Sequence, residues 1–117
     1  MVYGIYSGLS ALRAIQVKTQ TTANNVANIN TDEFKRSRVT LVEGSPEGVN
    51  VTIRKIETPG PQVYEQTPRG TELIEKSNVD LTEEIPNMML SRRAYQANIK
   101  TIQVEDEMLG MLLDIKS

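Results

Sequence analysis

The chain of 117 residues contains no cysteine, no histidine and no tryptophan, and it has a single phenylalanine. Without cysteine and histidine it has no thiol nucleophile, disulfide, imidazole base or usual zinc ligand. The scarcity of aromatic residues leaves isoleucine, leucine, valine and methionine to supply most of the apolar surface that folding buries. This composition favours long helices over a compact globule, and we expect no metal, no cofactor and no enzymatic activity.

Neither sign of charge dominates, because the chain has 13 basic and 15 acidic residues. Proteins that bind nucleic acids concentrate basic residues on one face, whereas the largest basic group here is Lys35, Arg36 and Arg38. We therefore expect no nucleic-acid partner. No stretch approaches the ~20 apolar residues of a membrane span. The first residues also lack the basic and apolar regions of a cleaved signal peptide.

Residues 1–31 are predicted to form the first of two long helices. Their seam positions recur at alternating spacings of four and three, the heptad pattern of a helix that packs against another helix. The apolar members of this seam are Ile5, Leu9, Leu12, Ala23 and Val26, and Gln16 and Thr19 interrupt it. Gly4 and Gly8, one turn apart, are expected to allow close packing between subunits.

Residues 80–117 predict a second, longer helix. Asp80 and Glu83 have the spacing of a capping box, in which the second residue reaches back to the first. The apolar seam runs through Ile85, Met88, Tyr95, Ile99, Ile102, Leu109 and Leu113, and Arg92 and Asp106 interrupt it. These two charges either pair with polar groups on the first helix, such as Gln16, or lie beside the seam with their heads in water.

The last turns of this second helix carry more apolar residues than one stripe can hold. Beside the main seam, a second stripe runs through Val104, Met108, Met111 and Ile115. A helix that is apolar around most of its circumference is buried on several sides. Since the chain offers only one other long helix, we expect the second stripe to contact other subunits.

Residues 32–79 show a different period. Val39 and Leu41 alternate with polar neighbours, and so do Val49, Val51 and Ile53, as in a half-buried strand. A further short strand is expected at Val63 and Tyr64. Most of the prolines lie in this segment and break it into short pieces. The segment is therefore predicted to be a small β-rich module.

Together these patterns predict a mainly α fold with three parts. Residues 1–31 and 80–117 form one helical domain, with the two helices paired as a coiled coil, and residues 32–79 form the β-rich middle arm. The expected surface for helix pairing and assembly consists of Ile5, Leu9, Leu12, Val26, Ile85, Met88, Tyr95, Ile99, Ile102, Met108, Leu109, Leu113 and Ile115.

Both ends carry motifs that resemble those of the bacterial flagellar rod and hook family of axial proteins. The N-terminal motif is Ala23-Asn24-Asn25-Val26-Ala27-Asn28, followed by Phe34-Lys35-Arg36. The C-terminal motif begins at Asn78-Val79-Asp80-Leu81-Thr82-Glu83-Glu84 and continues through Arg93-Ala94-Tyr95-Gln96-Ala97-Asn98. The two motifs stand in the family's order. The short middle segment is similar to the proximal-rod branch of the family, and especially to its C-type member.

The resemblance implies a structural subunit of the flagellar basal-body rod, which polymerises through its terminal helices into the axial drive shaft around the export channel. The implied partners are further copies of the chain, other axial rod proteins and the flagellar export apparatus. The implied location is the periplasm-spanning rod, reached without a cleaved signal peptide. A soluble coiled-coil adaptor or flagellar export chaperone is the alternative. An enzyme would need more than acidic clusters such as residues 105–107, because no base or nucleophile accompanies them.

Three details of the motifs leave structural questions open. Asn24, Asn25 and Asn28 either fix the joint between the first helix and the middle arm, bond a neighbouring subunit, or cap the helix in water. The family usually has glycine immediately before the aromatic residue, where it would adopt a positive φ at little cost, and this chain has Glu33. Pro86 removes a helix hydrogen bond, so the second helix either begins later or is kinked.

Overall fold

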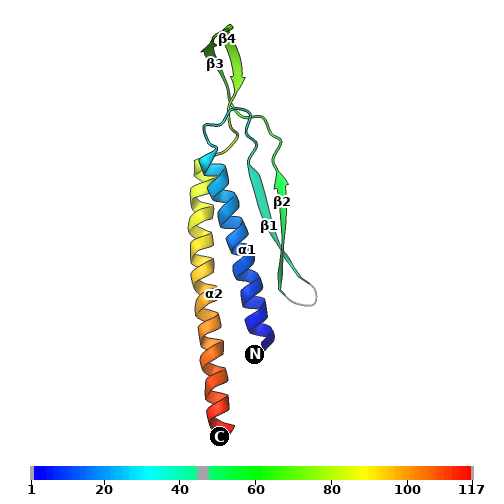
Figure 1. Cartoon of the computed structure of the whole chain (residues 1–117), viewed down its shortest axis with the longest axis vertical. Helices are drawn as coiled ribbons and strands as arrows, with labels where there is room; N and C mark the ends of the chain where they lie inside the picture. The colour runs from blue at the N-terminus through cyan, green and yellow to red at the C-terminus, as the bar shows by residue number, and fades with distance from the viewer. Residues whose placement is uncertain (1, 45–47, 117) are drawn as a thin grey trace.

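The computed structural model describes residues 2–44 and 48–116 as an elongated molecule that measures 80 × 24 × 20 Å. The elements follow in the order α1 (Val2–Ala27), β1 (Ser37–Glu43), β2 (Val49–Lys55), β3 (Gln62–Thr67), β4 (Gly70–Glu75) and α2 (Leu81–Lys116). α1 lies between α2 and the β1–β2 hairpin, and the β3–β4 hairpin projects from the end where the chain passes from α1 to β1 (Figure 1). Two long helices and a β-rich middle therefore agree with the predicted fold class. The coiled-coil form of the helix pair stays a prediction.

The two helices run antiparallel and approach each other most closely through small residues of α1. A Cβ added to Gly8 would lie 2.9 Å from Cγ1 of Ile102, and one added to Gly4 would lie 2.6 Å from a carboxylate oxygen of Glu105. Both glycines therefore face α2 of the same chain, which corrects the expectation that they serve packing between subunits. The Glu105 carboxylate also lies beside the first turn of α1, where the helix dipole favours negative charge.

In the first turns of α2, the contact with α1 runs about one residue away from the predicted apolar seam. Two side chains in the first turns of α2 are the buried ones in the described part of this helix: Glu84, which is 5% exposed, and Ser91, which is 3% exposed. They precede the predicted seam positions Ile85 and Arg92 by one residue, or about 100° around the helix. Arg92 and Asp106 are exposed, in agreement with the second of the two alternatives for these charges. In the first turns of α2 the predicted apolar seam consequently lies beside the intramolecular contact, whereas farther along the helix the seam residue Ile102 meets Gly8 of α1.

The β1–β2 hairpin covers the opposite side of α1. Ser10 donates its hydroxyl to the carbonyl oxygen of Val49 at 3.0 Å and accepts the N–H of the same residue at 2.9 Å. Ala14 and Ile15 are the buried apolar residues of the described chain, and they lie in the middle of α1. Because only α1 is covered from two sides, the intramolecular core is small.

The four strands form two separate antiparallel hairpins. In the first, Leu41 pairs with Val51, and in the second, Tyr64 pairs with Leu73. The predicted strands at residues 39–41, 49–53 and 63–64 are confirmed by β1, β2 and β3. β4 was not predicted, because its only apolar residues are adjacent and do not alternate. The turn before it places Gly70 at φ 116°, a conformation that glycine adopts at little cost.

α2 begins where the sequence placed its N-cap. Asp80 accepts the N–H of Thr82 at 2.9 Å and its hydroxyl at 2.7 Å, and these two hydrogen bonds lower the pKa of Asp80. In the predicted capping box, the side chain of Glu83 would also reach back to Asp80. In the structure Oε2 of Glu83 instead lies 2.5 Å from Nη1 of Arg36, with which it forms an ion pair. Pro86 lies inside the helix, which starts at Leu81 nonetheless.

Candidate functional site

The N-terminal motif places one fully buried polar side chain, that of Asn25, at the junction of three elements. Its Nδ2 donates to the carbonyl oxygen of Ser37 at 2.9 Å, and its Oδ1 accepts the N–H of Ser37 at 3.0 Å. Nδ2 also donates to Oε1 of Glu84 at 3.3 Å. Asn25 is only 1% exposed, so it joins α1, the first residue of β1 and the first turns of α2 while shielded from bulk solvent. A buried amide that uses both of its polar atoms specifies one geometry.

Glu84 completes this junction from the α2 side. Burial raises the pKa of Glu84, while the hydrogen bond from Asn25 and the nearby Arg36 and Arg38 act in the opposite direction. Glu84 belongs to the C-terminal motif but was not predicted as a site residue. An acidic residue in the first turn of a helix usually faces water and the helix dipole. Its burial follows only from the position of Asn25.

The other two asparagines of the motif act at the end of α1. Asn28 donates its Nδ2 to the carbonyl oxygen of Asn24 at 2.8 Å, and its Oδ1 accepts the hydroxyl of Thr31 at 3.0 Å. Asn24 is exposed. Among the alternatives for these residues, Asn25 therefore fixes the joint within the chain, and Asn28 caps the helix.

Lys35 and Arg36 tie the N-terminal motif to the segment that leads into α2. Lys35 forms an ion pair with Glu75, and this pair together with the N–H of Gly60 lowers the pKa of Glu75. Arg36 pairs with Glu83, and its backbone N–H donates to Oδ1 of Asn78 at 2.6 Å. The two family motifs, more than 40 residues apart in the chain, are therefore in direct contact.

Asn78 is a second junction residue that the site prediction missed. Its Nδ2 donates to the carbonyl oxygens of Ile56 at 2.7 Å and Thr58 at 2.9 Å. Its own N–H donates to the carbonyl oxygen of Phe34 at 3.2 Å, and Phe34 is half-buried. Asn78 thus joins its own segment, which leads into α2, to the segments at residues 34–36 and 56–58. The signal available in the sequence was its place at the head of the C-terminal motif.

Glu33 adopts the backbone conformation that the sequence analysis associated with the missing glycine. Its φ is 59°, and its N–H donates to the carbonyl oxygen of Glu75 at 2.9 Å. A residue with a Cβ adopts this left-handed conformation at a cost of about 1–2 kcal/mol. Glu33 thus has the positive φ expected of a glycine at this position, and the hydrogen bond to Glu75 holds the turn.

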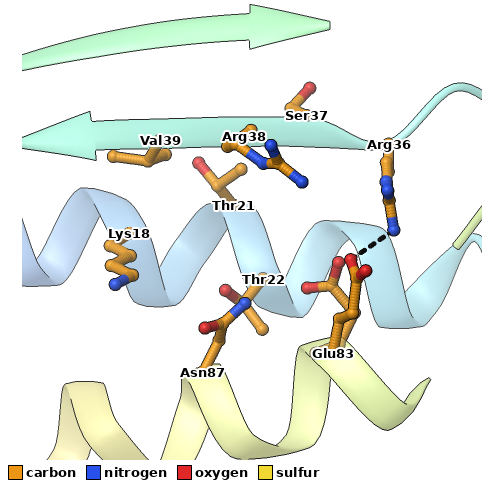
Figure 2. Close-up of a pocket in the computed structure, with 10 residues that line it drawn as sticks. Lys18, Thr21, Thr22, Arg36, Ser37, Arg38, Val39, Glu83 and Asn87 are labelled. Carbon is orange, nitrogen blue, oxygen red and sulfur yellow. Dashed lines mark hydrogen bonds and ion pairs between the residues drawn. The ribbon is translucent and has the colours of Figure 1, made fainter. Parts of the chain in front are cut away.

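A pocket of about 180 Å³ lies beside the junction (Figure 2). Figure 2 shows Lys18 and Thr22 from α1, Arg38 from β1 and Asn87 from α2 turned toward the same space. The pocket also contains the carboxylates of Glu83 and Glu84. Both are held by the partners described above, and within residues 2–44 and 48–116 no three acidic residues are grouped so as to hold a metal ion.

The predicted assembly residues divide into two groups by exposure. Ile5, Leu12, Val26, Ile102 and Leu109 are half-buried, whereas the exposed residues are Leu9, Ile85, Met88, Tyr95, Ile99, Met108, Leu113 and Ile115. Exposure is highest near the end of α2, where Leu113 is 62% and Ile115 81% exposed. Met89 and Leu90, also exposed, were missed because they lie off both predicted stripes. In the described part of the chain, neither helix has the length and apolarity needed to cross a membrane.

Two family profiles match this chain, one at each end. The profile described as "Flagella basal body rod protein" matches residues 5–35, and "Flagellar basal body rod FlgEFG protein C-terminal" matches residues 72–115. The first match contains Asn25 and Lys35, and the second contains Asn78 and Glu84, so the junction is made by residues of both matched segments.

Individual relatives match over shorter segments. The flagellar hook protein FlgE of Escherichia coli (strain K12) is 42% identical over 43 residues, which are 37% of this chain and 11% of that protein. FlgE of Treponema pallidum (strain Nichols) is 39% identical over 67 residues, 57% of this chain and 14% of that protein. The flagellar basal-body rod protein FlgG of Bacillus subtilis (strain 168) is 48% identical over 41 residues, 35% of this chain and 16% of that protein. The chain thus spans less than a fifth of the length of these relatives. With its two ends matched in order, the chain belongs to the flagellar basal-body rod and hook protein family.

Proposed function

We propose that this chain is a structural subunit of the bacterial flagellar basal-body rod. In this proposal it polymerises through its terminal helices into the axial drive shaft around the export channel. The observation that carries the proposal is the set of apolar residues of α2 that stay exposed in the described part of the chain. Family membership supports a structural role in the flagellar axis rather than a catalytic one.

The size of the exposed surface supports assembly. Met111, Leu112, Leu113 and Ile115 are 49–81% exposed, and they lie on adjacent turns of one helix. Burying such a side chain completely contributes roughly 1.5–3 kcal/mol. Exposed apolar residues gathered in this way on adjacent turns are typical of a protein–protein interface. α1 cannot cover it, because its first described turn faces Glu105.

Within this proposal the three parts of the chain have different tasks. Residues 1–31 and 80–117 form the helical domain that assembles, through the predicted surface of Ile5, Leu9, Leu12 and the apolar positions of α2. Residues 32–79 form the arm that spaces the subunit from its neighbours. The junction at Asn25 keeps the arm and the two helices in one fixed relation, which a regular polymer of identical subunits requires.

The short arm supports the proximal-rod branch, and within it the C-type member, over the hook. The relatives described above are longer hook and rod proteins, of which the matched segments make up 11–16%. On this proposal the partners are further copies of the chain, neighbouring axial rod proteins and the flagellar export apparatus. The location is the part of the rod that crosses the periplasm.

Electron microscopy of the purified chain at increasing concentration tests the proposal. We expect rod-like particles that lengthen with concentration, and we expect deletion of residues 103–117 to abolish both these particles and swimming motility. A soluble adaptor or export chaperone, the alternative, would stay a compact monomer or dimer at every concentration. If the full chain behaves in that way and the deletion leaves motility intact, the axial proposal is wrong.

A further inference from the structure

The sulfur atoms of this chain all belong to methionine, since the sequence contains no cysteine. Apart from Met1, which lies outside the described residues, the methionines are all in α2. Met111 is 65% exposed, Met89 56%, Met108 49% and Met88 36%. Methionine commonly fills irregular gaps in a core. These side chains instead present much of their surface to water.

Met108 and Met111 belong to the apolar surface near the end of α2. They are three residues apart and therefore share a face of the helix. Leu112 and Ile115, which follow them by one turn each, are exposed as well. At this end of the molecule α2 continues past the start of α1 (Figure 1). The two methionines are therefore part of the surface that the proposed function assigns to contacts between subunits.

A methionine thioether that meets water is open to oxidation by a hydroperoxide. With hydrogen peroxide, the sulfur lone pair attacks one oxygen and the O–O bond breaks. The second oxygen leaves as hydroxide and takes the proton of the first to give water. The sulfur loses two electrons to the peroxide and becomes a sulfoxide, which is polar and chiral. Reductases specific for each sulfoxide epimer return it to methionine.

The surroundings of Met108 and Met111 offer no hydrogen-bond donor to a sulfoxide oxygen. On a helix, the neighbouring side chains are those three and four positions away. For these two methionines, besides each other, they are Val104, Glu105, Glu107, Leu112, Asp114 and Ile115. The apolar members have no polar atom, and ionised carboxylates only accept hydrogen bonds. A sulfoxide oxygen here depends on water for its hydrogen bonds.

Met88 and Met89 differ from this pair because donors lie near them. Met88 lines a groove between α1 and α2 that also contains the side chains of Gln16 and Gln20. Met89 lines a smaller groove with Arg93. Amide and guanidinium groups donate hydrogen bonds, so a sulfoxide at either position has partners within the chain. The two pairs of methionines should therefore respond differently to oxidation.

We propose that Met108 and Met111 are reversible oxidation sites and that their sulfoxides block assembly of this chain. The inference rests on the proposed function, since it adds a chemical control to the surface through which the chain polymerises. In the free chain the sulfoxide oxygen is hydrated and the fold is unchanged. In a contact between subunits it loses that water without gaining a donor, which weakens association by roughly tenfold for each sulfoxide. Neighbouring subunits cover the sulfurs of an assembled copy, so oxidation acts on the free subunit.

Leucine variants of the full chain separate the two pairs, because leucine replaces methionine with little change of volume. The parent, Met108→Leu/Met111→Leu and Met88→Leu/Met89→Leu are oxidised with hydrogen peroxide, freed of it, and compared with untreated samples by sedimentation velocity. We expect oxidation to raise the concentration needed for assembly by about tenfold or more in the parent and in Met88→Leu/Met89→Leu. Met108→Leu/Met111→Leu should assemble as before. The opposite pattern, or an oxidised parent that assembles normally although mass spectrometry finds both sulfoxides, overturns the inference and leaves the proposed function standing.

Mass spectrometry of the oxidised parent supplies a second test that needs no variant. In the free chain Met111 should be oxidised before Met88, in the order of their exposure, and the far-ultraviolet circular dichroism spectrum should not change. In assembled rods Met108 and Met111 should be oxidised several-fold more slowly than in the free chain. Treatment with the two sulfoxide reductases should restore assembly.

Three results of this second test overturn the inference while the proposed function stands. They are equal oxidation rates of Met108 and Met111 in rods and free chain, loss of helix on oxidation, and failure of complete reduction to restore assembly. An untreated parent that stays monomeric at every concentration overturns the inference together with the proposed function.

Discussion

Replacing Asn25 with alanine tests the claim that one buried amide holds the three elements together. The change removes the donor to the Ser37 carbonyl, the acceptor of the Ser37 N–H and the donor to Glu84. The two hydrogen bonds to Ser37 contribute about 1 kcal/mol each. The one to the Glu84 carboxylate is longer at 3.3 Å, so we assign it the lower end of the range for charged partners, about 1.5 kcal/mol.

The expected loss is therefore about 3–4 kcal/mol of the free energy of unfolding. It is large because Asn25 is 1% exposed, so water cannot replace the lost partners without opening the junction. Asn24→Ala is the matched control one position earlier. Asn24 is exposed, and its substitution should change stability by no more than about 0.5 kcal/mol.

Urea denaturation followed by far-ultraviolet circular dichroism measures both variants, with the midpoint and the slope reported separately. Asn25→Asp adds an independent check, since it keeps the acceptor for the Ser37 N–H and places a second carboxylate beside Glu84. Its loss of stability should be greatest at neutral pH and should shrink as the solution is acidified. Equal effects of Asn24→Ala and Asn25→Ala would refute the reasoning.

Three further changes test single features of the fold, each by the urea midpoint. Glu33→Gly should stabilise the chain by about 0.5–1 kcal/mol, because relief of the positive φ outweighs the added freedom of the unfolded chain; a loss of stability would contradict this. Gly8→Ala should destabilise it by about 1 kcal/mol, because the added methyl meets Ile102 and this outweighs the better helix propensity of alanine; no change would show that the helices can separate freely. Glu84→Gln should be more stable than the parent at pH 7 and equal to it near pH 4. A carboxyl whose pKa is raised in the folded state favours folding at low pH and loses that contribution as pH rises above its ordinary value of 4.5, so a difference that does not vary with pH would contradict the burial of this charge.

Local patterns were sufficient to predict the helices and three of the four strands. Heptad spacing located both helices, Asp80 located the start of the second, and alternation located the strands around Leu41, Val51 and Val63. β4 lacked alternation and gained its structure from pairing with β3. Such pairing depends on contacts outside the strand, and no residue pattern within β4 itself predicts it.

The position of the helix contact could not be predicted from apolar periodicity. The main apolar stripe of α2 was predicted to pack against the other helix, which is the usual arrangement for a helix in a globular protein. In this chain the intramolecular contact uses Gly4 and Gly8 together with Glu84 and Ser91. Of the apolar stripe, Ile102 packs against Gly8, whereas Ile85, Tyr95 and Leu113 are exposed. A reading based on hydrophobicity cannot distinguish a stripe that packs within the chain from one that packs between chains.

The junction residues were predicted unevenly for a related reason. Asn25, Lys35 and Arg36 belong to a motif that the sequence shows, but their partners at Glu75, Asn78 and Glu84 are 40 to 60 residues away. Only the antiparallel return of α2 brings these partners together. The positive φ at Glu33 was the exception, because a missing glycine points to the conformation that a glycine would have adopted.

The central claim is that the apolar face of α2 is an assembly surface, and sedimentation velocity of a triple variant tests it most directly. Met111→Ser, Leu112→Ser and Ile115→Ser change exposed side chains in the last turns of α2. We expect the parent chain to sediment as progressively larger particles as its concentration rises, and the triple variant to stay monomeric with an unchanged helical circular dichroism spectrum. A parent chain that stays monomeric, or a triple variant that assembles as readily as the parent, would contradict the account.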